Sequence, residues 1–414
     1  MTERRLLIDV SRMIWRLWTG RIPTGIDRVC LAYVEHFGPR SQAVIQRKGQ
    51  RHILSPAHSD ALFALLLGGG HAFRRRFVLL AARVLLSRPQ TRLSGSPVYL
   101  NVGHTGLDQP DLPAWIAGLG IRAVFLICDL IPLTHPEFCR EGESERHRLR
   151  ITNALRGAGG IISISQMTAT EIEAFAEGAG LPMPPHVVAW LAGHPLPSTI
   201  APPPISRPYF VSVGTIEGRK NHVLLLQLWK RLVQKHGDKA PMLVIIGQRG
   251  WEAEHVLAML DRAPSLQGHV LELNNASDSE LAGYIAGARA LLMPSFVEGF
   301  GIPVVEALQL GTPVIASDLQ VFREIAGDIP HYLDSSDGAG WERAIGEFLT
   351  DGQERRRQLA LMPSYTPPSW ASHFEHVEQW LEELAGSAAS VANRCQPVAR
   401  PHFSGMPSKS AAIK

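Results

Sequence analysis

The sequence predicts an α/β protein with two doubly wound, Rossmann-like domains. Short apolar segments of strand length alternate with longer helical segments along most of the 414-residue chain. This alternation is the pattern of α/β proteins with parallel sheets. A proline-rich segment at 195–208 interrupts it and is typical of an interdomain linker. The chain length also fits two domains of ordinary size.

The composition indicates a globular protein rather than a disordered or membrane-spanning one. Hydrophobic residues make up 45% of the chain, and the mean hydropathy is +0.01. The longest apolar run, 61–67, is shorter than the roughly 20 residues of a spanning helix. Asp9 interrupts the apolar start, so we expect no signal peptide. The four cysteines lack metal-like spacing, which favours a reducing, cytoplasmic location.

The charge is distributed unevenly along the chain. Residues 1–100 contain 16 basic and 5 acidic residues, a net charge of +11, whereas the remaining residues carry −8. A basic first domain is expected to attract a phosphate-rich partner, either an anionic membrane surface or a phosphorylated acceptor. A solvated basic surface is the ordinary alternative.

Residues 56–88 have a helical pattern in which Gly68-Gly69-Gly70 separates two helices. The second helix places Arg74, Arg75 and Arg76 beside a run of apolar residues. A basic amphipathic helix of this kind can lie on an anionic membrane. A core helix with one charged face has a similar pattern, so the sequence leaves both interpretations open.

The first domain should begin with a strand at 6–10, followed by a turn at Gly25 that opens a helix through Phe37. This is the first unit of a doubly wound sheet, in which ligands bind above the carboxyl ends of the strands. A single glycine there is also compatible with nothing more than a tight helix entry.

Three more strands are predicted in the first domain, at 98–102, 123–127 and 160–164. Polar residues follow them: His104 after the first, Cys128 and Asp129 after the second, and the candidate helix caps Ser165 and Thr168 after the third. His104 and Asp129 are therefore candidates to face a ligand. A structural histidine or a capping aspartate has the same pattern.

The second domain repeats the alternation more clearly. Strands are predicted at 209–213, 242–247, 269–273, 290–294 and 313–316. Helices are predicted at 222–235, 341–349 and 370–384, and we expect the last of them to pack back across the junction. The resulting boundaries are a first domain at 1–195, a linker at 196–208, a second domain at 209–367, a C-terminal helix at 368–385 and a disordered tail at 386–414.

One stretch of the second domain, residues 296–308, combines a glycine loop with a helix start. Gly299 and Gly301 break the chain after a strand, and Pro303 suits the first helical turn. A helix start offers free N–H groups and the positive end of the helix dipole to an anion, most often a phosphate. Glu298 and Glu306 are expected to flank this anion site.

A second loop of the same domain, Gly214 to Asn221, carries Arg219 and Lys220 between a strand and a helix. Fixed cations there would stabilise the negative charge of a departing nucleoside diphosphate. Glu298 could accept hydrogen bonds from sugar hydroxyls and Glu306 from a ribose diol. Each of these residues alone would ordinarily be a solvated surface residue. Together, within one half of the chain, they favour a sugar-nucleotide site.

These motifs resemble those of the retaining GT-B glycosyltransferases of sequence family four, the glycosyl transferases group 1. The resemblance runs from Val211 to Ala326 and includes two glutamates with seven residues between them. Its other motifs are 214–221, 247–251, 277–281 and 311–317; the first domain matches more loosely, through 24–29 and 128–133. The similarity is to members that build bacterial surface polysaccharides, such as mannosyltransferases. It implies two Rossmann-like domains facing each other across a cleft.

The resemblance also implies a role for each matching position. Lys220 and Glu298 would be the catalytic residues, with Lys220 on the donor diphosphate and Glu298 on the sugar ring. Glu306 would bind the ribose hydroxyls, and Arg219 would share the leaving-group charge. The backbone groups that would help them belong to Gly299, Phe300 and Gly301 at the sugar and to Val304 and Val305 at the diphosphate.

Two further donor-binding positions follow from the same resemblance. Gly25 would bring a first-domain loop against the donor phosphates when the cleft closes, and Arg249 would approach the base or ribose. Such enzymes need no catalytic metal and no cofactor, because the nucleotide-sugar is a co-substrate. The leaving-group charge would then be stabilised by Lys220, Arg219 and the helix dipole.

The chain departs from the family pattern at two positions. Thr215 stands where many relatives have arginine, so Arg219 either substitutes for it or the grip on phosphate is weaker. Cys128 stands where relatives commonly have a histidine that faces the transferred sugar. Either His104 takes over that polar role or the reacting geometry differs.

We therefore expect a retaining, metal-independent hexosyltransferase, with mannose from GDP-mannose as the first choice of donor. The acceptor would be a glycan, lipid-linked and presented at the inner face of the cell membrane, with peripheral contact through the basic first domain and no nucleic-acid partner. Two alternatives remain. Thr215 and Cys128 favour a catalytically silent GT-B scaffold partner, and a nucleotide-sugar epimerase would require an acid–base pair that the sequence does not reveal.

Overall fold

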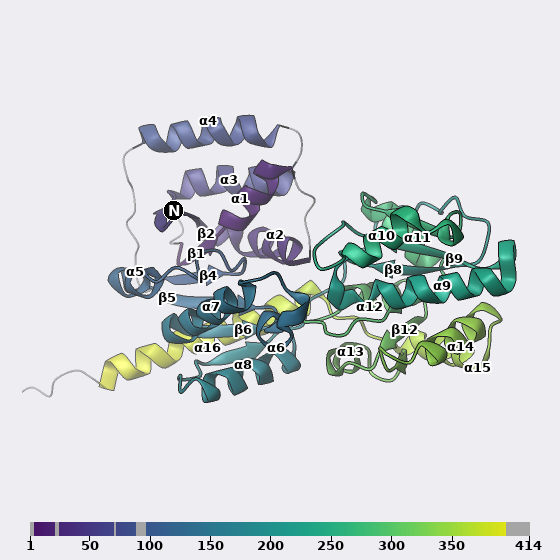
Figure 1. Ribbon diagram of the computed structural model, residues 1–414. Helices are drawn as coiled ribbons and strands as arrows, with labels where there is room; N and C mark the ends of the chain where they lie inside the picture. The colour runs from purple at the N-terminus through teal and green to yellow at the C-terminus, as the bar shows by residue number, and fades with distance from the viewer. Residues whose placement is uncertain (1–3, 21–24, 70–71, 88–96, 395–414) are drawn as a thin grey trace, which may run out of the picture.

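The computed structural model describes residues 4–20, 25–69, 72–87 and 97–394. It contains two α/β domains side by side, each built around one largely parallel sheet (Figure 1). The strand order is β3-β2-β1-β4-β5-β6-β7 in the first sheet and β10-β9-β8-β11-β12-β13 in the second. In each sheet, the strands that follow the first strand are added on one side of it and the later strands on its other side. Both domains are therefore doubly wound, as predicted.

The described part of the first domain holds seven strands and the helices that cover them. The strands are β1 (Leu6–Asp9), β2 (Ser41–Arg47), β3 (Gln50–Ile53), β4 (Val98–Asn101), β5 (Arg122–Ile127), β6 (Ala158–Ser163) and β7 (His186–Val188). The helices are α1 (Ser11–Thr19), α2 (Gly25–Phe37), α3 (Pro56–Gly68), α4 (Phe73–Leu86), α5 (Leu112–Leu119), α6 (Ile131–Thr134), α7 (Glu143–Gly157) and α8 (Gln166–Gly178). Among the described strands, β3 alone runs antiparallel to its neighbour.

The predicted strands β1, β4, β5 and β6 are confirmed, whereas the β2–β3 hairpin was not predicted. In β2, two glutamines interrupt the apolar pattern although both are buried. The Gln46 amide donates to Asp9 Oδ2 at 2.5 Å and to the Tyr99 hydroxyl at 2.6 Å. Such internal hydrogen bonds make polar residues acceptable in a core strand, but they cannot be recognised from periodicity.

The second domain holds six parallel strands. They are β8 (Tyr209–Val213), β9 (Met242–Ile246), β10 (Val270–Leu273), β11 (Leu291–Met293), β12 (Val314–Ser317) and β13 (His331–Leu333). Its helices are α9 (His222–His236), α10 (Glu254–Arg262), α11 (Asp278–Ala286), α12 (Ile302–Gln309), α13 (Gln320–Ala326), α14 (Gly338–Leu349) and α15 (Gln353–Leu361). The predicted strands β8 to β12 are confirmed.

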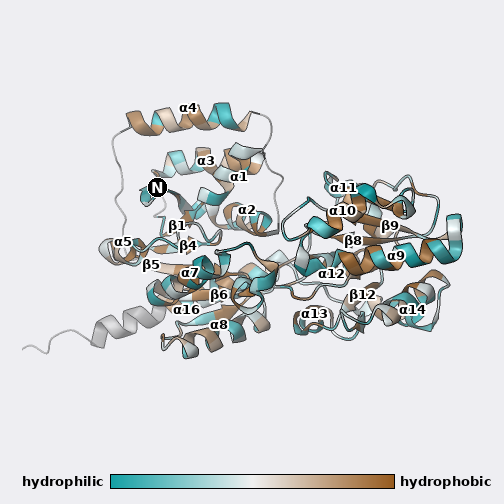
Figure 2. Cartoon of the chain, in the orientation of Figure 1, coloured by the Kyte–Doolittle hydropathy of each residue, from teal (hydrophilic) through white to brown (hydrophobic). Residues whose placement is uncertain are grey.

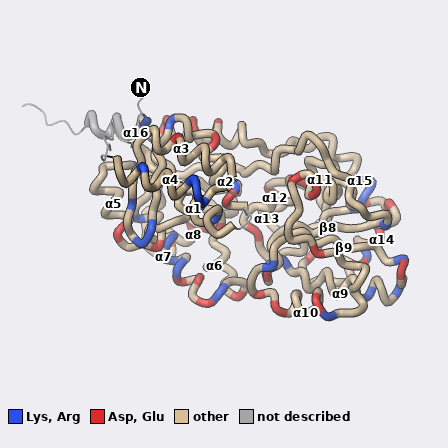
Figure 3. The backbone as a smooth tube through the Cα atoms, turned by 90° about the horizontal axis from the view of Figure 1, so that it is seen from above, with Lys and Arg blue, Asp and Glu red and all other residues tan. Residues whose placement is uncertain are grey.

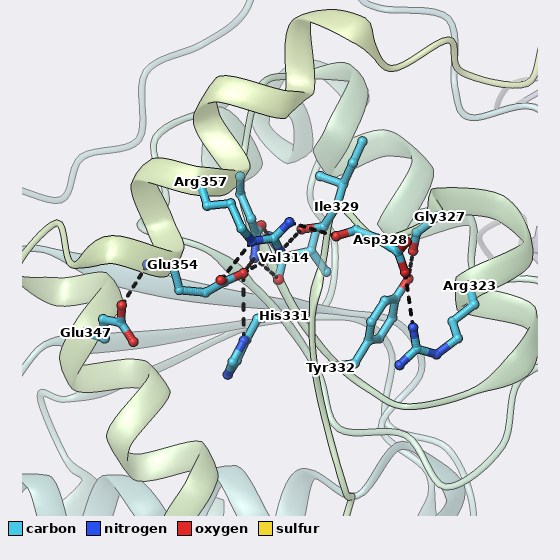
Figure 4. A network of polar contacts seen from close by, with 11 residues as sticks. Val314, Arg323, Gly327, Asp328, Ile329, His331, Tyr332, Glu347, Glu354 and Arg357 are labelled. Atoms are coloured by element: carbon cyan, nitrogen blue, oxygen red, sulfur yellow. Dashed lines mark hydrogen bonds and ion pairs between the residues drawn. The ribbon is translucent and has the colours of Figure 1, made fainter.

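The edge strand β13 and helix α15 were not predicted, and a polar network holds them in place (Figure 4). Arg357 on α15 pairs with Glu354 at 2.5 Å and donates to the carbonyls of Asp328 and Ile329, both at 2.9 Å. The Tyr332 hydroxyl donates to the Gly327 carbonyl at 2.7 Å. Because side-chain contacts rather than an apolar run fix this edge, periodicity does not reveal it.

Apolar side chains cover both faces of each sheet, as parallel sheets require. Along β5, Phe125 and Leu126 point into different core clusters on opposite faces. Along β9, Val244 and Ile245 do the same. One cluster continues from the first domain into the second, so the two domains share part of their core. Within the described residues, we find no helix that combines the length and the apolar character needed to cross a bilayer.

The last helix, α16 (Trp370–Arg394), returns from the second domain and lies against the first (Figure 1, yellow). His373 Nε2 lies 2.9 Å from the Tyr33 hydroxyl on α2, and His373 Nδ1 lies 3.0 Å from the Trp190 carbonyl. The expected end of the helix at 385 was wrong, since alanine-rich sequence carries it to Arg394. The rest of the expected tail, 395–414, lies outside the described residues.

Candidate active site

The loop between β11 and α12 positions Glu298 and the start of α12. Gly301 precedes α12 with φ +110, a conformation that favours glycine. A Cβ at Gly301 would also lie 2.6 Å from Phe322 Cε1, so no larger residue fits. Pro303 occupies the first turn of the helix, as expected. The turn therefore holds Glu298 just before α12, while Glu306 lies within it.

Glu298 is buried and accepts three charged or polar donors. Lys220 Nζ lies 2.5 Å from Oε1, and Arg219 Nη1 lies 2.6 Å from Oε2. The Ser295 hydroxyl donates to Oε1 at 2.8 Å. Burial alone would raise the pKa of Glu298, but the two cations outweigh it and lower the pKa to about 2. Glu298 is therefore ionised at physiological pH.

The two cations belong to the single turn 218–220 that follows β8. Gly214 lets the Lys220 side chain pass, because a Cβ at Gly214 would lie 3.1 Å from Lys220 Cε. Arg219 Nη2 also pairs with the buried Glu217 at 2.6 Å. The Arg219 carbonyl accepts from Phe296 N at 2.8 Å. The main chain therefore links this turn to residues 296–301, the loop that contains Glu298, which we call the glutamate loop.

Lys220, Arg219, Glu217 and Glu298 thus form a compact group, which we call the ion quartet. Two positive and two negative side chains make it electrically neutral when all four are ionised. Burial raises the pKa of Glu217, while Arg219 and Lys220 act in the opposite direction. A buried charge is stable only while it has partners. A ligand that binds the cations must therefore also satisfy the carboxylates.

Glu306 lies beside a cavity at the junction of the domains. Its Oε1 accepts from His194 N at 3.3 Å and lies 3.2 Å from His194 Nδ1. The cavity is lined by residues 194–197 together with Asp278, Leu281, Ala282 and Ile285 of α11 and Glu306, Gln309 and Leu310 of α12. Glu298 therefore lies before the start of α12, and Glu306 lies within the helix, beside the cavity.

The first domain contacts this site through main-chain groups and small residues. A Cβ on Gly299 would lie 2.6 Å from the Cys128 carbonyl and 3.0 Å from Asp129 Cβ. The Ser165 hydroxyl donates to the Gly299 carbonyl at 3.2 Å. A Cβ at Gly25, the first residue of α2, would lie 3.8 Å from Ile302 Cδ1 at the start of α12. The structure thus brings Gly25, Cys128 and Asp129 to the glutamate loop.

Two of the predicted residues are engaged elsewhere. His104 Nε2 bonds the Leu126 carbonyl at 2.7 Å, and burial together with His147 lowers the pKa of His104 to about 3, so the imidazole is neutral. Arg249 is exposed and pairs with Asp261 at 2.6 Å and Glu272 at 2.8 Å. Neither residue is brought to the ion quartet.

The Thr215 methyl group lies next to Gly250, since a Cβ at Gly250 would lie 2.7 Å from Thr215 Cγ2. Arg219 supplies the second cation at Glu298 instead. Of the two readings of this departure, the geometry favours substitution by Arg219.

Several residues of the site were not singled out from the sequence. Glu217 and Ser295 lie next to predicted motifs and could have been found there. Glu324 on α13 could not have been found from the sequence. Its carboxylate accepts from Gln166 N at 2.6 Å at the start of α8 and from Trp190 Nε1 at 2.7 Å. This contact joins the second domain to residues more than a hundred positions away.

Comparison with known proteins supports the resemblance. Residues 200–360 match the protein family described as glycosyl transferases group 1. The serotype-specific mannosyltransferase WbdA of Escherichia coli is 30% identical over 246 residues, which cover 56% of this chain and 30% of WbdA. The O-antigen chain mannosyltransferase B of Escherichia coli is 35% identical over 147 residues, covering 36% and 38%. The chain spans about a third of the length of these curated relatives.

Solved structures show the same fold at low sequence identity. HepE of Anabaena, crystallised in complex with UDP, aligns with a TM-score of 0.62 at 14% identity over 91% of this chain and 99% of HepE. Sucrose-phosphate synthase of Thermosynechococcus elongatus aligns with a TM-score of 0.57 at 15% identity, over 92% of this chain and 99% of the synthase. The fold of the chain is GT-B, as expected.

Proposed function

We propose that the chain is a retaining glycosyltransferase that moves a hexose from a nucleotide-diphosphate sugar to a glycan acceptor. The observation that carries this proposal is the ion quartet at the start of α12, with Lys220 and Arg219 both on Glu298. Such fixed charges can bind a diphosphate and a sugar at the same time. The family match of the second domain supports the same chemistry.

On donor binding, the diphosphate oxygens take over Lys220 and Arg219, and the N–H groups of Val304 and Val305 assist them. Glu298 then loses its cationic partners and accepts hydrogen bonds from the sugar hydroxyls instead, together with the backbone of 299–301. Glu306 accepts from the ribose hydroxyls next to the junction cavity. Glu298 exchanges one set of donors for another, and Arg219 keeps its Nη2 contact with Glu217, so no buried charge is left unpaired.

In the transfer step, the bond between the anomeric carbon and the phosphate oxygen breaks, and the diphosphate keeps the electron pair. The acceptor hydroxyl forms the new bond to the same face of the anomeric carbon. Its proton passes to the departing phosphate oxygen. Lys220, Arg219 and the positive end of α12 stabilise the departing charge, so the proposed mechanism assigns no role to a metal or cofactor.

We further propose mannose as the sugar and GDP-mannose as the donor. Support comes from the names of the relatives, since WbdA and the O-antigen chain enzyme are both mannosyltransferases. The proposed acceptor is a lipid-linked glycan of a surface polysaccharide, presented at the cytoplasmic face of the membrane.

The test is incubation of the protein with labelled GDP-, UDP- and dTDP-sugars and a membrane extract. We expect transfer from GDP-mannose, and product NMR should show the donor's anomeric configuration. Glu298→Gln should abolish transfer, whereas Lys235→Ala, an exposed change on α9, should not. A folded protein that neither hydrolyses nor transfers any donor would refute the proposal.

The second candidate is a catalytically silent GT-B partner of another transferase. Cys128 favours it, because relatives commonly have histidine at this position, and burial raises the pKa of the Cys128 thiol. Nucleotide binding without turnover would support this reading. An epimerase would instead release a changed nucleotide-sugar without any acceptor, which the same assay detects.

A further inference from the structure

Helices α1 and α4 present a second apolar stripe to solvent. We call it the α1–α4 face; its members are Trp15, Trp18, Val78, Leu79, Leu85 and Leu86 together with Arg74, Arg75, Arg76 and Arg83. Leu85 and Leu86 are 85% and 88% exposed, and Trp15 and Leu79 are 63% and 62% exposed. Leu85 and Leu86 are therefore almost fully outside the fold, and Trp15 and Leu79 are more than half exposed.

The exposure is not a by-product of packing α4 onto the domain. The inner stripe of α4 already consists of Phe73, Phe77, Leu80 and Val84, spaced four and three residues apart. A helix at the surface needs one apolar stripe, and its outer face is ordinarily polar. Large apolar residues gathered on an outer face mark an interaction surface.

The charge on this face has one sign. Helix α4 contains four arginines, and neither α1 nor α4 contains aspartate or glutamate. The two arginines of α1, Arg12 and Arg16, pair with the buried Asp27 and do not add to this charge. Figure 3 shows these basic residues on α1 and α4. Figure 2 shows polar residues toward the N-terminal end of α4 and apolar residues toward its C-terminal end. Arg75 and Arg76 are exposed and make no ion pair with a described residue.

The two helices act as one surface because Arg74 joins them. Its Nε donates to the Trp18 carbonyl at 2.6 Å, and its guanidinium lies 6.0 Å from the centre of the Trp18 ring. Trp18 also packs edge-on against Phe77 with ring centres 6.1 Å apart. Tryptophan and arginine at one level beside leucine are the combination that suits the boundary between lipid tails and headgroups.

We propose that the α1–α4 face docks on a bilayer that contains anionic phospholipid. The leucines and tryptophans enter the headgroup region, and the arginines bind the lipid phosphates. Helix α4 has 14 residues, fewer than the roughly 20 of a spanning helix, so it lies in the plane of the membrane. Charge complementarity selects lipid over a second copy of the chain, whose own α1–α4 face would repel it.

The location of the α1–α4 face connects membrane docking to access of the acceptor to the cleft. Only this connection rests on the proposed function. Helix α1 ends at Thr19, shortly before Gly25, which faces the start of α12. Docking through α1 and α4 would hold the cleft beside the bilayer surface. A lipid-linked acceptor could then reach the cleft without leaving the membrane.

The test is flotation of the full-length protein with vesicles of phosphatidylcholine alone and of phosphatidylcholine with 30% phosphatidylglycerol. We expect binding to the anionic vesicles, weak binding to the neutral ones, and loss of binding in 0.5 M NaCl. The variants Arg75→Glu/Arg76→Glu and Leu85→Ser/Leu86→Ser should each reduce the bound fraction at least about tenfold.

Matched controls change similar residues on the second domain. Lys235→Glu/Lys239→Glu and Leu359→Ser/Leu361→Ser alter exposed residues there and should bind like the parent protein. Equal binding to both vesicle types, no binding to either, or losses as large in the controls would overturn the proposal. So would a dimer in light scattering that disappears in Leu85→Ser/Leu86→Ser.

Vesicle binding needs no donor, so its outcome is separate from that of the proposed function. We expect the two α4 variants to keep nucleotide binding and transfer to a water-soluble acceptor. Vesicle binding without transfer from any donor would refute the transferase and leave the docking surface intact. Transfer without vesicle binding would refute the docking surface and leave the transferase intact.

Discussion

The two sides of the cleft are built in different ways. The second domain provides four charged side chains from two loops, and all of them lie within ion-pair distance of a partner. The first domain provides the Cys128 carbonyl, the Ser165 hydroxyl and Gly25. Its Asp129 is used locally and accepts from Ile131 N at 3.1 Å at the start of α6. This difference teaches that the charged groups around Glu298 come from the second domain, whereas the first domain contributes main-chain and uncharged groups to the contact.

Removing a cation from the donor side should have the largest effect. We expect Lys220→Met to reduce transfer about a hundred- to a thousandfold, because one fixed charge at the leaving group is lost. Cys128→Ser on the opposite side should cost less than about tenfold. Steady-state kinetics with GDP-mannose compares the transfer rates of Lys220→Met and Cys128→Ser, with Lys235→Met as the control. Similar losses at 220 and 128 would contradict the division of roles.

The stability of the donor side should depend on pH through Glu298. Its pKa is about 2 in the fold instead of 4.5, so its contribution is fully present above about pH 4.5 and is lost as the pH falls toward 2. The shift corresponds to about 3 kcal/mol. Urea unfolding should show Glu298→Gln less stable than the parent at pH 7, with a smaller gap at pH 3.

An exposed glutamate provides the control for that experiment. Glu145 has a side chain that is 83% exposed, so Glu145→Gln should follow the parent at every pH. A gap between Glu298→Gln and the parent that stays constant from pH 7 to pH 3 would show that the ion pairs do not hold Glu298 ionised.

Two buried carboxylates should separate nucleotide binding from folding. Glu306→Ala should weaken nucleotide affinity by about tenfold or more, because the ribose hydroxyls lose a charged acceptor. Asp27 lies between Arg12 and Arg16, each at 2.7 Å. Asp27→Ala should lower the free energy of unfolding by about 3–5 kcal/mol with little change in affinity. Calorimetry on the folded variants measures their nucleotide affinities. Equal losses of affinity in Glu306→Ala and Asp27→Ala would refute the assignment of Glu306.

The smallest expected effect concerns the contact between the two sides. A methyl group in Gly299→Ala would meet the Cys128 carbonyl, so the domains must move slightly apart. We expect transfer to fall a few-fold while nucleotide affinity stays within about twofold. Gly346→Ala on α14, where a Cβ has open space, should leave both unchanged. Small-angle scattering would detect the opening, and unchanged kinetics would show that the contact is dispensable.

The sequence predicted most of the second domain because its signals are local. Strands β8 to β12 are short apolar runs, and the residues of the ion quartet lie within two glycine-containing loops. The sequence also predicted that Lys220 and Glu298 share a site, although not that they bind each other.

Features that depend on distant partners could not be predicted. The ion pairs of Arg249 with Asp261 and Glu272 are one example, whereas its expected approach to the base or ribose stays a prediction. His104 follows a strand end as a ligand-binding residue would, but its positive φ and its bond to the Leu126 carbonyl determine where it lies. Glu324 contacts α8 across the junction, and no local pattern indicates that.

The position of α16 has a consequence for the order in which the chain folds. Phe374, Val377, Leu381 and Leu384 are buried in the shared core, and Trp380 packs on Gly160 of β6 in the first domain. These residues leave the ribosome after the whole second domain. The first domain therefore cannot complete its core during its own synthesis, and we expect it to remain partly open to chaperones and proteases until the last helix arrives.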